Sequence, residues 1–226
     1  MENPLLFSLG LSLRVALTAT FLVIFFGSGV GYLLAKKDFR GKELVDILFT
    51  LPLVLPPTVT GYYLVLLFGK TGLIGSSIYK WTGWSIMFTP YAAVLASFIV
   101  ALPLMIKTTR AAIESIDINL INASYTLGQS EFSTVLKVII PLAKKGIMAG
   151  AALSFARAMG EFGATLMLAG NIPGRTQTMP LAIYTSASNG DWDLAHGMAA
   201  VFTAVSGVIL YGVIRLERKG FRWRFQ

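Results

Sequence analysis

The sequence contains no cysteine and one histidine among its 226 residues. Disulfide bonds and thiolate metal sites are therefore excluded, and a single imidazole does not supply the several protein ligands that a zinc site needs. Charged residues are also scarce, since they make up 13% of the chain whereas a soluble domain carries about 25%. We therefore expect neither a metal centre nor an ordinary soluble domain.

Apolar residues, in contrast, make up 55% of the chain, and the mean hydropathy is +0.69. A helix needs about 20 predominantly apolar residues to cross a bilayer. The composition predicts an all-α polytopic membrane protein, a single domain over residues 1–226, with about five spanning helices. The first apolar run is longer than a signal-peptide core and its basic cluster follows it, so we expect it to be retained. The predicted spans are residues 15–35, 47–68, 89–106, 147–169 and 196–214.

The net charge of +8 raises the question of a nucleic-acid partner, but the positive residues lie between the apolar runs. Membrane proteins carry an excess of Lys and Arg in their cytoplasmic loops. Most of the basic residues fall in residues 36–46, residues 107–145 and the tail after residue 214. We therefore predict a lipid bilayer and no nucleic acid as partner, with the amino terminus outside and the carboxyl terminus in the cytoplasm.

The predicted cytoplasmic loop at about residues 110–145 is polar and has the pattern of a helical hairpin. Asp117 is a plausible N-cap for a short helix ending near Leu127, and Gly128 fits the left-handed position that ends such a helix. Ser130 can cap a second helix, after which Pro141 is expected to bend the chain toward the fourth span.

Two interpretations of this hairpin remain open. It is either a linker folded against its own spanning helices or an element that docks on another protein. A linker needs only a few residues, and a helix of about ten residues is marginal by itself in water. These considerations favour docking.

The spacing of the hairpin resembles the EAA loop of ABC-importer permeases. The matching pattern is Asn122-Ala123-Ser124, three residues, Gly128, nine residues, and then Val138-Ile139-Ile140-Pro141. Asn122 and Ser124 depart from the Glu and Ala of that family. The resemblance implies that the first helix docks into a cleft of an ATPase subunit. The candidate coupling residues are Asp117, Asn122, Ala123, Ser124, Leu127, Gly128, Ser130 and Pro141.

Three further stretches resemble the molybdate-type permease: LPLVLPPTVTGYYL (51–64), FARAMGEFGATLMLAGNIPG (155–174) and RTQTMPLAIY (175–184). Tungstate and sulfate permeases share much of this pattern. The resemblance implies a type I ABC importer permease in a bacterial or archaeal cell membrane. It also implies two ATPase subunits, which use ATP, and an external oxyanion-binding protein. Five spans are few for a gated path, so we expect a two-fold homodimer with the pathway at its interface.

Arg157 and Glu161 lie inside the fourth predicted span, where charges are costly and usually face protein or a water-filled path. Their spacing places them on one face of a helix, so they can pair. One interpretation is a self-neutralising pair that holds helices together. The other is a pathway element in which Arg157 attracts an oxyanion and Glu161 limits how tightly it binds.

Prolines interrupt the second predicted span, and they free carbonyls that neighbours or a cavity must satisfy. This segment is either a deformable pore lining or a kink needed for packing. We regard it as the better candidate for pore lining. The candidate residues are Pro56, Pro57, Thr58 and Thr60.

Catalytic motifs are lacking in the sequence. Gly69-Lys70-Thr71 resembles the end of a phosphate-binding loop, but the glycine that the motif needs five residues before Gly69 is Leu64. No nucleophile lies in a recognisable arrangement with a base. We predict a transport subunit that is not an enzyme and binds no cofactor itself. A secondary transporter or channel is the alternative class, although it would not account for the long hairpin.

Overall fold

The computed structural model describes residues 4–222, with side chains as far as Val213 and at Arg215, and every regular element in that part of the chain is a helix. The elements are α1 (Pro4–Lys36), α2 (Lys42–Val54), α3 (Pro57–Phe68), α4 (Gly75–Thr82), α5 (Pro90–Glu114), α6 (Ile118–Thr126), α7 (Glu131–Thr134), the π-helical turn η1 (Val135–Ile139), α8 (Ile140–Met159), α9 (Gly163–Ala169), α10 (Met179–Ser188) and α11 (Trp192–Arg222).

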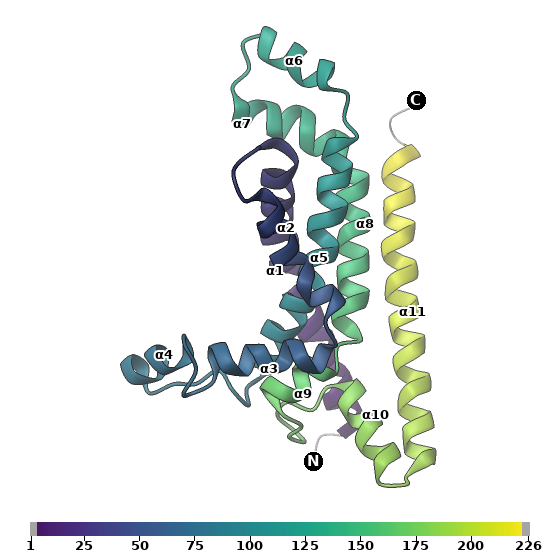
Figure 1. The fold of residues 1–226 in the computed structure, drawn as a ribbon. Helices are drawn as coiled ribbons and strands as arrows, with labels where there is room; N and C mark the ends of the chain where they lie inside the picture. Colours follow the sequence, from purple (N-terminus) through teal and green to yellow (C-terminus); the bar gives the residue numbers. More distant parts are fainter. Residues whose placement is uncertain (1–3, 223–226) are drawn as a thin grey trace.

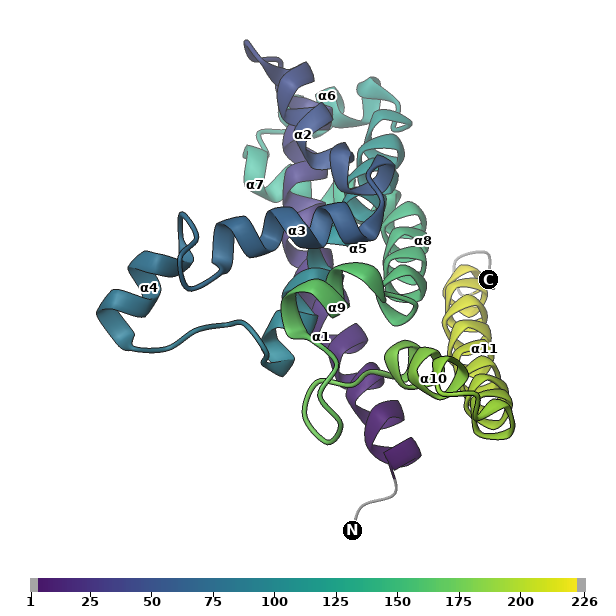
Figure 2. The same cartoon turned by 60° about the horizontal axis from the view of Figure 1, so that its bottom comes forward.

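The long helices lie roughly side by side along one axis (Figure 1). The α1–α2 loop, α6, α7 and the end of α11 gather at one end, which we call the hairpin end, whereas the start of α1 and α10 lie at the other. The described parts of the three basic regions that the sequence assigns to one side of a membrane therefore lie at one end. Helices α3 and α4 form an arm that projects sideways in both views (Figures 1 and 2).

The core forms around α5, which packs along α1 and α8. Small residues such as Ala16 and Ala19 of α1 and Ala101 of α5 are fully buried there, together with Met105 and with Phe155 of α8. Small side chains let membrane helices approach closely, so that dispersion contacts replace the hydrophobic driving force that lipid does not provide. Helix α5 is therefore the central helix, against which α1, α2, α3, α8 and α9 all pack.

Among the described residues, four helices are long and apolar enough to cross a membrane: Pro4–Lys36, Pro90–Glu114, the continuous run Glu131–Met159, and Trp192–Val213. They correspond to the first, third, fourth and fifth predicted spans, although their bounds differ. Helix α5 runs beyond residue 106 to Glu114, so the hairpin loop begins later than residue 110. Thr89 caps its start, with its side chain accepting a hydrogen bond from the N–H of Ala92.

The second predicted span, residues 47–68, is not one straight helix. It is split into α2 and α3, which meet at an angle of 120°. Leu55 and Pro56 are both extended, with ψ near 140°, because a residue that precedes proline is forced out of the helical region. Pro52, in contrast, is accommodated inside α2. The double proline therefore bends this span sharply, so that residues 4–222 contain four unbroken candidate spans and one bent one.

The fourth predicted span, residues 147–169, is also wrong as a single helix. Helix α8 ends at Met159, and residues 160–162 separate it from the short helix α9. Glycine at position 160 contributes little to helix stability, and the carboxylate of Glu161 caps the new helix, as described below. The spanning helix instead extends in the other direction, back to Glu131.

Gly27 and Gly31 of α1 lie where this helix crosses α5. A methyl group added at Gly31 would lie 2.9 Å from the carbonyl oxygen of Ile106 and 2.9 Å from the Cβ of Thr109. Both are closer than real Cβ contacts, and one neighbour is backbone that cannot rotate away. These glycines are therefore required for packing.

Gly31→Val is expected to lower the free energy of unfolding by about 1–3 kcal/mol, because overpacking forces the two helices apart. The measurement is the thermal unfolding temperature of the detergent-solubilised protein. Gly29→Val is the matched control, since a side chain there meets nothing within 4 Å. Equal unfolding temperatures for the two variants would contradict the packing role of Gly31.

Candidate functional site

The hairpin at one end of the molecule is closed by the three capping interactions that the sequence predicts. The side chain of Asp117 accepts a hydrogen bond from the N–H of Asn119 at 2.9 Å, and Ser130 accepts one from the N–H of Ser133 at 3.3 Å. Gly128 has a φ of +76°, a left-handed conformation that costs glycine no steric strain. The N–H groups of Gly128 and Gln129 bond back to the carbonyls of Tyr125 and Ser124, which completes a Schellman motif.

One face of α6 points into the hairpin. Ile121 is buried with Ile113, Ile139 and Ala143 in a small apolar cluster. Ser124 is also buried, and its hydroxyl lies 2.9 Å from the hydroxyl of Thr134 on α7. Ser124, one of the two departures from the family pattern, therefore braces the hairpin internally and does not lie on its exposed face.

The other face of α6 is open to solvent. Asn122, Ala123 and Gly128 are exposed, and Leu127 is 80% exposed. Ile118 and Leu120 of α6 are exposed as well, and several exposed apolar side chains on one short helix are typical of a surface that another protein covers. Four of the eight predicted coupling residues thus share one accessible surface. Asp117 and Ser130 are exposed caps, and Pro141 lies farther along the chain.

Two supports of the hairpin were not predicted. The hydroxyl of Tyr32 on α1 donates a hydrogen bond to Glu131 at 3.1 Å, and the hydroxyl of Thr134 forms the hydrogen bond with that of Ser124 described above. Tyr32 and Glu131 are 99 residues apart in the chain, so no local pattern marks the pair. The hairpin is therefore anchored to the first span as well as to α5 and α8.

The chain turns between α7, which runs across the hairpin end, and α8, which runs along the long axis (Figure 1), and Pro141 lies in the first turn of α8, where a bend was expected. Helical structure continues from Glu131 to Met159 through the π-helical turn η1. The N–H of Ile140 bonds to the carbonyl of Val135, five residues earlier. Proline has no N–H to donate, and its ring would clash with the preceding turn of an α-helix. The wider π-helical turn gives the ring room, so the helix continues past Pro141. Hairpin and span are therefore one continuous helical element.

Ser124→Ala is expected to loosen the hairpin by about 1–3 kcal/mol, because it leaves the buried hydroxyl of Thr134 without a partner. Hydrogen exchange of residues 118–134 is the measurement, and faster exchange there is the expected result. The double variant Ser124→Ala/Thr134→Val removes both hydroxyls and should recover most of the protection. Unchanged exchange in the single variant would show that the pair contributes no bracing.

The second group of candidate residues lies at the two breaks in the spanning helices. Pro56, Pro57 and Thr58, at the bend between α2 and α3, are exposed. Thr60 is buried in α3, and its hydroxyl has no hydrogen-bond partner within the described part of the chain. The bend therefore presents two prolines and one threonine to its surroundings, whereas Thr60 faces protein.

At the second break, Glu161 links the two helices that flank it. One carboxylate oxygen accepts a hydrogen bond from Arg157 Nη1 at 2.8 Å, and the other accepts one from the N–H of Ala164 at 2.8 Å. The Glu161 side chain is 1% exposed, whereas that of Arg157 is 27% exposed. The predicted pairing of the two residues is confirmed. The pair spans a helix end, however, because Glu161 lies beyond α8.

The two breaks touch each other. A Cβ placed on Gly163, the first residue of α9, would lie 3.0 Å from the Cβ of Pro57 and 3.0 Å from the backbone nitrogen of Thr58. A Cβ on Gly61 of α3 would lie 2.8 Å from the Cα of Ala164. Glycine on each helix thus allows backbone to meet backbone. The fold brings the bend of one span directly against the break of another, although the sequence did not predict this contact.

Helix α2, the half of the bent span nearer the hairpin end, is packed less closely against the rest of the protein than α3 is. No residue of α2 is buried. Its one acidic side chain in contact with α5 is Asp46, which pairs with Lys107 Nζ at 2.7 Å and with Arg110 Nη1 at 3.0 Å. Asp46 and Lys107 are 61 residues apart, so this tie was not foreseen. Helix α2 is thereby held by these ion pairs and by the partly buried side chains of Val45 and Phe49, which pack against the core, whereas α3 is packed closely on α9.

Residues 4–222 contain no group of three or more His, Asp or Glu side chains that could hold a metal ion. The chemistry available at the breaks is that of a positioned guanidinium, a buried carboxylate and proline-freed backbone. Such an arrangement can attract and guide an anion or change shape.

Comparisons with known proteins agree with this geometry. The model of the family described as "Binding-protein-dependent transport system inner membrane component" matches residues 27–222. The molybdenum transport system permease protein ModB of Haemophilus influenzae is 44% identical over 79% of this chain and 78% of its own length. ModB of Escherichia coli K12 is 42% identical over 77% of this chain and 76% of its own. An inward-facing structure of the MetNI methionine ABC transporter has a TM-score of 0.71 at 19% identity, covering 97% of this chain and 99% of that one.

Proposed function

The chain belongs to the family of binding-protein-dependent transport system inner membrane components, and from this premise we propose that it is the permease subunit of an ATP-driven molybdate importer. It is a multi-pass membrane protein and a transport subunit, not an enzyme. The proposal of molybdate as the substrate rests on the sequence identity of 42–44% with two molybdenum transport permeases over more than three quarters of the chain. Tungstate and sulfate are the alternative substrates within the same family.

The hairpin end is the proposed docking site for the ATPase. Its braced interior, through Ser124 and Thr134, keeps α6 rigid, while Ala123, Leu127 and Gly128 stay exposed. Binding energy at protein interfaces is concentrated in a few apolar anchors within a ring of weaker contacts, and Leu127 is placed to be such an anchor. In this proposal ATP is hydrolysed on two separate ATPase subunits, one for each permease.

The pathway is proposed to lie between two copies of the chain. Arg157 is partly exposed within a span-length helix, and a guanidinium facing hydrocarbon is costly unless protein or water covers it. The exposed bend at Pro56, Pro57 and Thr58 likewise has proline-freed backbone that needs a cavity or a partner. A two-fold homodimer covers both features and encloses a path between them.

Orientation follows from the gathering of basic loops at the hairpin end. We place that end in the cytoplasm of a bacterial or archaeal cell and the amino terminus outside, where an external oxyanion-binding protein delivers its cargo. Closure of the ATPase subunits then moves the docked hairpins and switches the path from inward-open to outward-open.

The test is ATP hydrolysis in liposomes that contain the permease with its ATPase subunit. Binding protein loaded with molybdate, tungstate or sulfate is added in separate experiments. We expect the molybdate-loaded form to stimulate hydrolysis and uptake. Stimulation by the sulfate-loaded form alone would overturn the substrate assignment, and oxyanion uptake without ATP would favour a secondary transporter.

A further inference from the structure

One continuous helix connects the hairpin to the middle of the molecule. It runs from Glu131 through α8 to Met159 and packs along α5 for much of its length. Helix α7 runs across the hairpin end and α8 along the long axis (Figure 1), but the chain between them stays helical throughout, so no flexible loop separates the hairpin from α8. Any movement imposed on the hairpin therefore arrives at residues 160–162, where the helix ends.

The connection across that end is made by one side chain. Glu161 holds Arg157 of α8 with one oxygen and the N–H of Ala164 in α9 with the other, each at 2.8 Å. Residues 160–162 belong to no helix. The N–H groups of Gly160 and Glu161 still bond to the carbonyls of Ala156 and Ala158, but both bonds are long, at 3.3 Å. Glu161 therefore sets the position of α9 relative to α8 while the intervening backbone stays deformable.

Helix α9 in turn is fitted against the bent span. Gly163 meets Pro57 and Thr58, and Gly61 meets Ala164, in contacts that leave no room for a further methyl group. A close-packed contact of this kind transmits displacement because it cannot be compressed. Movement of α9 is therefore passed directly to the bend at Pro56 and Pro57.

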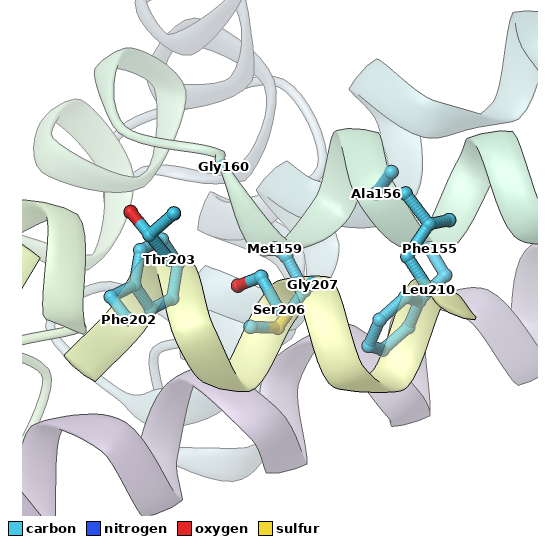
Figure 3. Close-up of a pocket in the computed structure, with 9 residues that line it drawn as sticks. All are labelled: Phe155, Ala156, Met159, Gly160, Phe202, Thr203, Ser206, Gly207 and Leu210. Atoms are coloured by element: carbon cyan, nitrogen blue, oxygen red, sulfur yellow. The ribbon is translucent and has the colours of Figure 1, made fainter. Parts of the chain in front are cut away.

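Open space lies on the other side of the same break. A cleft of about 380 Å³ separates α8 from α11 and is lined by residues that include Met159, Gly160, Phe202 and Gly207 (Figure 3). A second cleft of about 420 Å³ also borders Gly160 and Phe202. Both clefts are open to the surroundings of the protein and are not enclosed voids. The end of α8 therefore has room to shift toward α11.

From these contacts we infer that residues 160–162 form a joint, with Glu161 as its positioning residue, that passes hairpin movement through α9 to the bend at Pro56 and Pro57. The cleft beside Gly160 is the space into which the joint moves. This inference rests on the proposed function, because it requires ATP-driven movement of the hairpin. It adds the route by which that movement reaches the pathway.

Filling the cleft is the first test. Gly207→Leu places a side chain in the cleft, and a Cβ there meets nothing within 4 Å. Gly212→Leu makes the same change on the same helix away from the cleft. In liposomes with the ATPase, Gly207→Leu is expected to lower transport per ATP at least about tenfold (about 1.4 kcal/mol) without lowering the unfolding temperature, whereas Gly212→Leu should leave transport unchanged.

Equal transport by the two variants would contradict the inference that residues 160–162 form a joint. Loss of the dimer in Gly207→Leu would also overturn it, since the cleft would then be a seat for the second copy. If the unaltered chain shows no ATP-dependent transport, the proposed function itself fails, which is a distinct result.

The second test detects movement directly and uses the absence of native cysteine. Ala156→Cys puts the only thiol of the chain in the cleft, and Ala204→Cys puts it on an exposed part of α11. We expect the labelling rate at position 156 to differ at least about fivefold between nucleotide-free and ATP-trapped complexes (about 1 kcal/mol), with no difference at position 204.

Glu161→Ala in the Ala156→Cys background should abolish that difference while ATP hydrolysis continues, because both bonds across the joint are lost. A purely structural role for Glu161 would leave the difference intact in every complex that assembles. An unchanged difference in this variant, or no difference in the parent, would overturn the inference.

Discussion

Gly128→Asp is expected to release the ATPase subunit from the permease, weakening the complex by about 2 kcal/mol or more, which is about 30-fold in affinity. Gly128 is exposed at the tip of the hairpin, and a side chain there meets no atom of the chain within 4 Å. A carboxylate at this point would be buried in the proposed interface without a cation, and an unpaired buried charge is costly. Co-purification of the two subunits is the measurement.

The matched control is Gly128→Asn, which has the same shape and tolerates the left-handed backbone about as well but carries no charge. Its affinity for the ATPase should fall less than that of the Asp variant. Thermal unfolding of the permease by itself should be similar for the two variants, since the position is open. A fully active complex retained by Gly128→Asp would exclude docking at this face of α6.

Removal of the charge at position 157 is expected to reduce oxyanion transport at least about tenfold (about 1.4 kcal/mol) while assembly with the ATPase persists. Arg157→Ala by itself is a poor test of this, because it leaves the carboxylate of Glu161, which is 1% exposed, without its cation. Loss of one partner of a buried pair costs about 3–5 kcal/mol, so assembly itself would be weakened.

The neutral pair Arg157→Met/Glu161→Gln avoids that cost. Glutamine keeps an oxygen for the N–H of Ala164, so the cap of α9 is preserved, and methionine fills most of the volume of arginine. We expect normal co-purification, an unchanged unfolding temperature and a large loss of molybdate uptake. Arg157→Lys, which keeps a positive charge, should retain much more uptake. Full uptake by the neutral pair would mean that the two residues only hold helices together.

Local features of the hairpin were predictable from the sequence because they depend on neighbours within a few residues. Asp117, Gly128 and Ser130 cap or end helices as expected, since each bonds to backbone groups two or three positions away. The docking role assigned to these residues stays a prediction. Ser124 was grouped with them by its place in the motif, yet its hydroxyl faces Thr134, because the face that a residue takes depends on what packs against α6.

The sequence predicted one of the two breaks in the spanning helices but not the other. Two adjacent prolines predict a disruption of the second span, and the structure has a bend of 120° there. Hydropathy did not predict the break at residues 160–162, because Gly160 and Phe162 are compatible with an apolar helix and Glu161 was interpreted only as a partner of Arg157. Its second bond, to the N–H of Ala164, exists only because α9 begins there.

The sequence by itself therefore determined the membrane class, the approximate spans, the sidedness of the basic loops as a prediction, and the existence of the hairpin. These properties follow from composition and short-range spacing, which act through solvent preference and local hydrogen bonding. Only the tertiary structure decided that Gly163 rests on Pro57 and Thr58, that Asp46 fastens α2 to Lys107, and that a cleft lies beside Gly160. Those contacts join residues far apart in the chain, so they are set by how whole helices cross.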